Sequence, residues 1–277
     1  MTQSLLDHDR EPLTSPARRV LNVAHRGASS SAPENTVPAI RRAAQLGADL
    51  VEVDVRRSRD GVLVLLHDPT LARTTDVRRV FPDRGPWLVE DFSYDELVRL
   101  DAGSWFSPEH VGVRVATVDE ALDSARDAGV GLMLELKTPH LYPEMVVEVA
   151  ALLRGRRVPG SVEAAGAADQ VVVQSHHHHS MQTFKSLEPT VSVGLLGAPA
   201  IRRLAAISTW ADQINPGHFS VNARYVEAVH RHGMTCNVWT VNRRPAMRRV
   251  LDMGVDGVIT NRPGALQQVL GRQLTLV

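Results

Sequence analysis

The sequence predicts an α/β protein, a (β/α)8 TIM barrel with an insertion after the second strand region. Roughly eight short, β-branched runs alternate with helix-like segments, as expected for a barrel. Polar residues gather at the carboxyl ends of these runs, where barrel enzymes carry their chemistry. The alternation alone also fits an open doubly wound sheet, and the polar strand ends favour the barrel.

Strands are predicted where Val, Ile and Leu gather in short runs. In chain order the runs are Val20–Ala24, Val51–Val55, Val62–Leu66, Val130–Leu134, Val171–Gln174, Val191–Leu195, Asp212–Asn215, Met234–Val238 and Val255–Ile259. Glycine is favoured just past a helix end, because it adopts left-handed backbone easily. The glycines that separate a helix-like segment from the next run are Gly47, Gly129, Gly233 and Gly254.

Helix starts are marked by capping residues. Thr117, with Glu120 three residues later, forms the pattern of a capping box. Pro143 suits the first turn of a helix, and Asn222 and Asn242 are predicted N-caps. These signals place helices between the predicted strands.

The alternation of strand-like and helix-like segments stops between Thr70 and Val115. This stretch is polar, contains several prolines and has one helix-like piece at Tyr94–Leu100. A connection this long is unusual inside a compact domain unless it is functional. We therefore predict that residues 70–115 form an insertion over the active face. The rest of the chain divides into a flexible N-terminal arm, residues 1–19, and a barrel domain, residues 20–277.

The composition narrows the class of protein. The 31 basic residues balance 31 acidic ones, so neither nucleic acid nor an anionic membrane is indicated as a bulk partner. Cys236 is the single cysteine, which excludes an intrachain disulfide. No run approaches the roughly 18 apolar residues of a membrane span, and the arm lacks the apolar core of a secretory signal. We expect a soluble, cytoplasmic protein without stable membrane insertion.

Two acidic residues lie close together in the second run. Alternation along Val51–Val55 places Glu52 and Asp54 on one face of a strand. Two adjacent buried carboxylates need a compensating cation, and hard cations such as Mg²⁺ or Ca²⁺ prefer oxygen ligands. His25 and His67, near these acids in the sequence, suit proton transfer near neutral pH.

Ordered motifs along the chain resemble those of the glycerophosphodiester phosphodiesterases. The matching segments are His25–Gly27, Ala32–Thr36, Glu52–Asp54, His67–Leu71, Arg73–Thr75, Leu100–Gly103, Glu135–Lys137, Gln174–Ser175, Trp239–Asn242 and Asp256–Asn261. The resemblance covers about Val20 to Gly264. It implies a (β/α)8 barrel that holds one divalent metal ion on Glu52, Asp54 and Glu135, with His25 and His67 as general acid and base.

The same resemblance suggests which residues contact the substrate. Arg26 suits bidentate binding of phosphate oxygens. Lys137 lies two positions after Glu135, which usually indicates a salt bridge between them, but here we favour a role for Lys137 in neutralising a phosphate. Trp239 either fills the core or forms a wall for the glycerol or alcohol moiety, and we favour the wall. Asn35 either caps the helix that starts near Val37 or contributes to the polar site, as does Glu34.

Two segments depart from the family pattern. An aromatic residue usually follows Gln174–Ser175, and here the run His176–His179 does. Such a run can bind transition metals, but we favour exposed loop histidines without a selected ligand. Ala116–Thr117 replaces the usual Pro-Thr and keeps the cap.

The sequence therefore predicts metal-dependent hydrolysis of a small glycerophosphodiester to sn-glycerol 3-phosphate and an alcohol, with Mg²⁺ or Ca²⁺ as the ion and Mn²⁺ as a third candidate. The nucleophile is either the glycerol 2-hydroxyl, as in the family, or water. The alternatives are a lysophospholipase D or phosphoinositide-type enzyme, for which Trp87, Trp105 and Phe106 offer an apolar rim, and a non-catalytic phosphodiester-binding barrel. The sequence leaves the oligomeric state and the preferred alcohol open.

Overall fold

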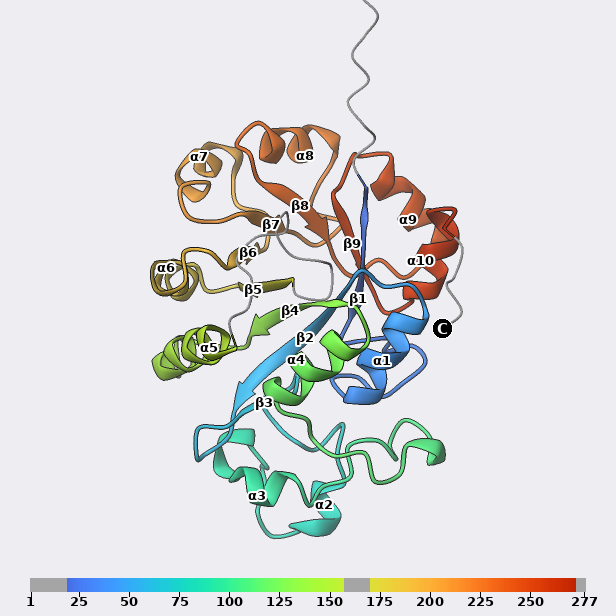
Figure 1. The fold of residues 1–277 in the computed structure, drawn as a ribbon, viewed down its shortest axis with the longest axis vertical. Coiled ribbons are helices and arrows are strands. Elements are labelled where there is room, and N and C mark those ends of the chain that lie inside the picture. Colours follow the sequence, from blue (N-terminus) through green and yellow to red (C-terminus); the bar gives the residue numbers. More distant parts are fainter. Residues whose placement is uncertain (1–18, 157–169, 273–277) are drawn as a thin grey trace, which may run out of the picture.

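The structure is a computed structural model that describes residues 19–156 and 170–272. Eight parallel strands form a closed barrel, because the sheet runs in the order β1-β9-β8-β7-β6-β5-β4-β2 and β1 also pairs with β2 (Figure 1). The barrel strands are β1 (Leu21–His25), β2 (Leu50–Arg57), β4 (Gly131–Leu136), β5 (Val171–Ser175), β6 (Ser192–Leu196), β7 (Gln213–Asn215), β8 (Thr235–Val238) and β9 (Gly257–Thr260). The predicted barrel is confirmed, and the open doubly wound sheet is excluded.

Helices surround the strands on the outside of the barrel (Figure 1). The longer ones are α1 (Val37–Gln45), α4 (Val118–Asp127), α5 (Pro143–Gly155), α6 (His178–Leu187), α8 (Ala223–His230), α9 (Arg244–Leu251) and α10 (Pro263–Val269), and η4 (Ile201–Arg203) with α7 (Leu204–Ile207) follows β6. Buried Val, Leu, Ile and Ala side chains fill the layer between strands and helices. A separate small cluster, which includes Met133 and Ile259, occupies the barrel interior.

One predicted strand does not belong to the barrel. The run Val62–Leu66 forms β3 (Leu63–Leu65), which pairs antiparallel with the end of β2, with Val55 opposite Leu65. A hairpin partner has the same β-branched composition as a barrel strand, so composition alone does not distinguish them. The chain leaves β3 at Leu65, and His67 comes two residues later.

The capping predictions are mostly confirmed. Thr117 and Glu120 form both hydrogen bonds of a capping box at α4, Pro143 lies in the first turn of α5, and Asn222 caps α8 by accepting from the Tyr225 amide. The prediction for Asn242 is wrong. Its side-chain oxygen accepts from Thr260 and from the amide of Asn261, while α9 begins after Arg243.

Gly27 shows how closely the loop after β1 approaches α1. Its φ of +80° is in the left-handed region, and a Cβ at this position would lie 2.6 Å from the Cβ of Ala39. The Ala28 amide donates to the Ala39 carbonyl at 3.0 Å. A side chain at position 27 would therefore push the loop after β1, which carries Arg26 and begins next to His25, away from α1.

The segment between β3 and α4 contains only short helices: α2 (Val77–Val80), η1 (Val89–Asp91), α3 (Tyr94–Leu97) and η2 (Pro108–His110). Its buried residues, among them Phe92 and Leu97, form a hydrophobic cluster of their own. In Figure 1 this segment lies beside β3, at one side of the barrel. The division into arm, barrel and insertion stays a prediction, and residues 1–18 of the predicted arm lie outside the described residues.

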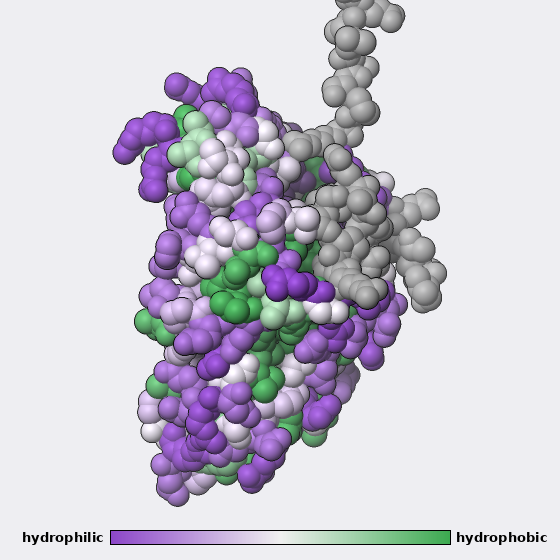
Figure 2. All heavy atoms as spheres, turned by 60° about the vertical axis from the view of Figure 1, so that its left-hand side comes forward, coloured by the Kyte–Doolittle hydropathy of each residue, from purple (hydrophilic) through white to green (hydrophobic). Residues whose placement is uncertain are grey.

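The surface on the side of α5 and α6 is mostly hydrophilic, with hydrophobic side chains gathered near its middle (Figure 2). Exposed hydrophobic residues on or next to these helices include Leu141, Val147 and Leu187. Among the described residues, no helix combines the length and the apolar character that crossing a membrane requires.

Candidate active site

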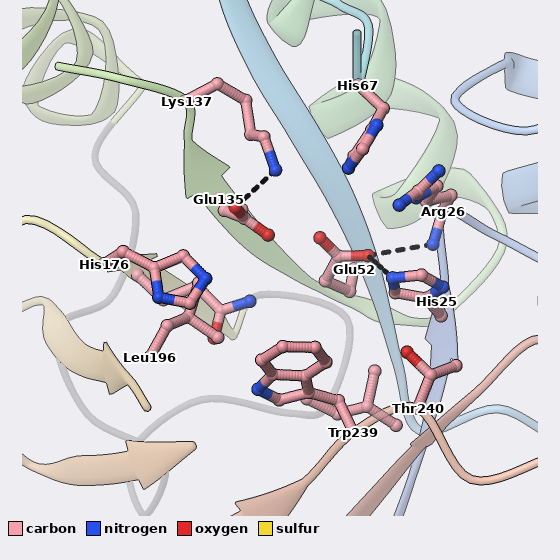
Figure 3. Close-up of a pocket in the computed structure, with 12 residues that line it drawn as sticks. His25, Arg26, Glu52, His67, Glu135, Lys137, His176, Leu196, Trp239 and Thr240 are labelled. Carbon is pink, nitrogen blue, oxygen red and sulfur yellow. Dashed lines mark hydrogen bonds and ion pairs between the residues drawn. The ribbon is translucent and has the colours of Figure 1, made fainter. Parts of the chain in front are cut away.

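A cavity of about 150 Å³ opens among the carboxyl ends of the barrel strands (Figure 3). The predicted site residues that line it are His25, Arg26, Glu52, His67, Glu135, Lys137 and Trp239. The other lining residues, which carried no predicted role, are Gln174, His176, Leu196, Thr240 and Ile259. Seven of the nine predicted site residues therefore face one space, and the remaining two, Asp54 and Asn35, contact it through neighbours.

Three carboxylates meet at the floor of this cavity. Glu52, Asp54 and Glu135 each offer an oxygen within 4.8 Å of the others. Parallel pairing of β2 with β4 sets Asp54 opposite Glu135, and alternation keeps Glu52 on the same face of β2 as Asp54. All three side chains are buried.

The oxygens of this cluster lack sufficient protein partners. Within the described part of the chain, Glu52 Oε1 is buried without a hydrogen bond, and Asp54 Oδ1 is buried with only an ion pair to Lys137 Nζ, at 3.3 Å. Buried polar atoms are rarely left without hydrogen bonds, and carboxylate oxygens are the preferred ligands of hard divalent cations. The donor set and these two oxygens fit a divalent metal ion.

Electrostatics within the cluster agree with this fit. Burial, followed by the charges of Asp54 and Glu135, raises the pKa of Glu52 well above its usual value. Burial acts in the same direction on Asp54, but the charges of Lys137 and Arg26 outweigh it and lower the pKa of Asp54. Glu52 is thus driven towards its neutral form, because the neighbouring protein cations do not compensate three negative charges.

Two basic residues border the carboxylates. Lys137 Nζ donates to Glu135 Oε1 at 2.6 Å and lies 3.3 Å from Asp54 Oδ1. Burial alone would lower the pKa of Lys137, yet Asp54 and Glu135 raise it, so the ammonium stays charged. Arg26 donates its backbone amide to Glu52 Oε2 at 2.9 Å, and its Nε lies 3.2 Å from Asp54 Oδ2.

Asn35 contacts Asp54 rather than the cavity. Its side-chain amide donates to Asp54 Oδ2 at 2.8 Å, and its oxygen accepts from the Asp54 backbone amide at 3.0 Å. Thr36, not Asn35, caps α1 by accepting from the Ala39 amide. Of the two interpretations for Asn35, capping is therefore wrong, and the contacts favour positioning of Asp54 over direct substrate binding.

His25 is fixed by Asn261, which lies in one of the family motifs and carried no predicted role of its own. Nδ1 of His25 lies 2.7 Å from Asn261 Oδ1; since an amide oxygen only accepts, the proton is on Nδ1 and the lone pair on Nε2. Nε2 lies 4.0 Å from Glu52 Oε2. Burial, helped by the Arg26 charge, lowers the pKa of His25 to about 4, so the ring is neutral at pH 7.

His67 has a carboxylate partner of its own. Nδ1 of His67 lies 2.7 Å from Asp68 Oδ1, and Asp68 accepts from Nε of Arg73 at 2.6 Å. The hydrogen bond from Arg73, aided by His67, lowers the pKa of Asp68 to about 2. The ionised Asp68 therefore orients His67 with Nδ1 as donor and leaves Nε2 for the cavity.

Glu34 links Arg73, the partner of Asp68, to Arg26 on the loop after β1. It accepts from Arg26 Nη1 at 2.9 Å and from Arg73 at 2.7 and 3.0 Å. Burial alone would raise the pKa of Glu34, but the two guanidinium groups lower it. Arg73 thus connects the loops after β1 and β3, a role that its place in a quoted motif did not reveal.

Trp239 lies between the barrel core and the cavity, and its role as a wall for the alcohol or glycerol moiety stays a prediction. Its ring lines the cavity and packs against the cluster in the barrel interior, while Nε1 donates to the Asn215 carbonyl at 2.8 Å. His176 contacts the ring edge-on, with centroids 6.0 Å apart. In the histidine run, His176 and His179 are exposed, whereas His177 caps α6. The histidine run is therefore only partly a loop, because α6 begins at His178.

Comparison with known proteins agrees with the site. The sequence profile described as the glycerophosphoryl diester phosphodiesterase family matches residues 25–265. A glycerophosphodiester phosphodiesterase of Bacillus subtilis is 34% identical over 91% of this chain and 86% of its own length. One from Caldanaerobacter subterraneus is 31% identical over 90% of this chain and 96% of its own length.

A solved structure shows the same fold. A phosphodiesterase from Oleispira antarctica, in complex with the product sn-glycerol-3-phosphate, superposes with a TM-score of 0.79 at 28% identity. The match covers 91% of this chain and 96% of that protein. Sequence and structure thus agree over nearly the whole barrel.

Proposed function

Because this chain belongs to the glycerophosphoryl diester phosphodiesterase family, we propose that it hydrolyses glycerophosphodiesters to sn-glycerol 3-phosphate and an alcohol. The observation that carries the proposal is one cavity lined by two histidines, two cations and buried carboxylates, two of whose oxygens lack hydrogen bonds within the described residues. The product that occupies the Oleispira relative supports the same reaction.

Glu52, Asp54 and Glu135 would hold one divalent ion, Mg²⁺ or Ca²⁺, with Mn²⁺ as a third candidate. When bound, such an ion stabilises negative charge that develops on phosphoryl oxygens. Asn35 keeps the Asp54 carboxylate in place through its two hydrogen bonds. The arrangement is rigid because all three carboxylates lie on β2 and β4, which are paired, buried strands.

Arg26 and Lys137 supply the positive charge that the protein itself brings to the phosphate. Both side chains line the cavity and are already oriented by carboxylates, Arg26 by Glu34 and Lys137 by Glu135. Cations that are fixed before the reaction stabilise the transition state without reorganisation. Their distance from bulk water strengthens this effect.

His25 and His67 carry out the proton transfers. Each ring is held at Nδ1 by a side chain, Asn261 or Asp68, and each lines the cavity. One histidine accepts the proton of the nucleophile and the other donates a proton to the leaving alcohol oxygen. Because two separate imidazoles are held in place, one can act as the base and the other as the acid in the same step.

The lipid-directed alternative finds little support in the structure. Trp87, Trp105 and Phe106, which would form its apolar rim, are not among the residues that line the active-site cavity. Trp87 packs against the hydrophobic cluster of the segment between β3 and α4. A small polar cavity suits a deacylated diester better than an acyl chain.

The direct test is release of sn-glycerol 3-phosphate from glycerophosphocholine and glycerophosphoglycerol, measured with and without a chelator. We expect turnover in the untreated protein, loss of turnover after chelation, and recovery on addition of Mg²⁺, Ca²⁺ or Mn²⁺. Full turnover by metal-stripped protein would overturn the carboxylate assignment. Failure to release sn-glycerol 3-phosphate with any of the three ions would overturn the proposed activity.

A further inference from the structure

A second cavity adjoins the active site and shares three of its residues. It measures about 420 Å³ and is lined on one side by Thr138, Pro139 and His140, from the loop after β4, and on the other by Ser175–His177. Glu135, Lys137 and His176 line both cavities. We call the second one the histidine cavity.

The active-site cavity is the smaller of the two, at about 150 Å³ against about 420 Å³. Lys137 lines both cavities. If the phosphate lies beside the carboxylates, one of its two ester groups can extend past Lys137 into the histidine cavity.

His140 and His177 form the wall of this cavity. Their rings stack with centroids 4.9 Å apart at an interplanar angle of 28°. They come from two different loops, so the stack joins the loop after β4 to the start of α6. Thr138, at the edge of the wall, has a φ of +48°. Such backbone is costly for a β-branched residue and often occurs at functional sites.

The orientation of His177 is set by α6. Nδ1 of His177 accepts from the Ser180 amide at 3.3 Å and lies 2.8 Å from the Ser180 hydroxyl. The His177 amide donates to Ser175 Oγ, which in turn donates to the Leu136 carbonyl. Because Nδ1 accepts, a neutral ring carries its proton on Nε2, and in the described residues no partner engages that atom.

The charges around the histidine cavity disfavour a cationic ligand. Burial, followed by the neighbouring His140 and His179, lowers the pKa of His177, which keeps its ring neutral at pH 7. Among the described residues, the only carboxylate in the lining is Glu135, which is bound to Lys137. The same part of the chain contributes no Trp, Tyr or Phe to the lining, although those rings are the ones that bind quaternary ammonium groups well.

We propose that the histidine cavity is the subsite for the alcohol group, and that its His140–His177 wall selects uncharged polyol alcohols over ammonium-bearing ones such as choline. Nε2–H of His177 is an open donor to a polyol hydroxyl oxygen, since Nδ1 is engaged by Ser180. Lys137 at the entrance repels an ammonium group. This inference rests on the proposed function and adds the class of alcohol to it.

The test compares kcat/KM for glycerophosphoglycerol and glycerophosphocholine, which share the glycerol phosphate half. The variants are His177→Asn, which retains a good N-cap for α6 but removes the ring, and His140→Ala. His179→Ala is the matched control, because His179 belongs to the same run but does not line the cavity. Thermal unfolding of each variant checks that it folds.

We expect the wild-type protein to prefer the polyol diester by about tenfold, the worth of one or two hydrogen bonds. His177→Asn and His140→Ala should each bring the two kcat/KM values close together, mainly by loss on the polyol diester, while His179→Ala keeps the preference. Equal or higher kcat/KM for glycerophosphocholine in the wild type would overturn the inference and leave the proposed function intact. So would an equal loss on both substrates in the two cavity variants. Turnover of neither substrate would overturn the proposed function, and this inference with it.

Discussion

Asn35 and Asp54 hold each other through two hydrogen bonds in opposite directions, at 2.8 and 3.0 Å. One bond fixes a carboxylate oxygen and the other satisfies the backbone amide of the same residue. Asn35 adopts a φ of +58°, a conformation that Asn tolerates better than most residues. The loop after β1 thereby determines the orientation of a carboxylate on β2.

We predict that Asn35→Gly weakens metal binding about 10- to 100-fold, the usual effect of removing a residue that orients a ligand. Glycine accepts the left-handed backbone, so the loss reports on the side chain. Isothermal titration with Mn²⁺ or Mg²⁺ measures it. Asn222→Gly, the same substitution at the N-cap of α8, should leave the affinity unchanged; equal affinities in both variants would show that Asn35 does not orient Asp54.

A second prediction concerns the glycerol side of the substrate, where a lysophospholipid carries an acyl chain. We expect a higher kcat/KM for glycerophosphocholine than for lysophosphatidylcholine, because the active-site cavity is small and the aromatics of the segment after β3 do not line it. The two substrates share a headgroup and differ in the acyl chain. The measurement is release of choline from each below its micellar concentration, and a preference for the lysophospholipid would reverse our choice between the two enzyme classes.

Cys236 provides a test of burial that is independent of the active site. Burial, with a smaller contribution from Asp256, raises the pKa of its thiol to about 12. The thiolate is the reactive form, so at pH 8 only about one molecule in 10⁴ carries it. We expect a thiol reagent to leave the native protein unlabelled for hours and to label one thiol in guanidinium. Rapid labelling of the native protein would contradict the buried position on β8.

The barrel could be predicted because its signals are local. Alternation of β-branched runs with helices, and glycines such as Gly47 and Gly129 at helix ends, depend only on neighbouring residues. The exception is β3, since a run of three apolar residues, Leu63–Leu65, does not reveal whether its partner strand is parallel or antiparallel. Strand direction depends on the turn and on contacts far along the chain.

The carboxylates and histidines could be predicted in part, because they lie in short motifs at strand ends. Their partners could not. Asn35 and Thr36 are adjacent residues of the capping type, and only the backbone conformation decides that Thr36 caps the helix. Arg73 reaches Glu34 across 39 positions, and no local pattern indicates such a contact.

The last prediction separates proton transfer from metal binding. If His25 and His67 transfer protons, His25→Ala and His67→Ala should each lower kcat about 10²–10⁴-fold. Their metal affinity should change little. Glu52→Ala and Asp54→Ala should instead weaken metal binding itself, because each removes a ligand from the cluster. Calorimetric metal titration of the four variants, beside their rates, provides the measurement.

The control is Glu148→Gln, which removes a carboxylate that is bound to Arg57 and lies outside the cavity. It should change neither metal affinity nor kcat. The effects of the two histidine substitutions should also fail to add in the double variant, since groups that act in one step behave as a unit. Loss of metal binding in both histidine variants, with normal binding in both carboxylate variants, would show that the two pairs have exchanged roles. Full additivity would show instead that the histidines act in separate steps.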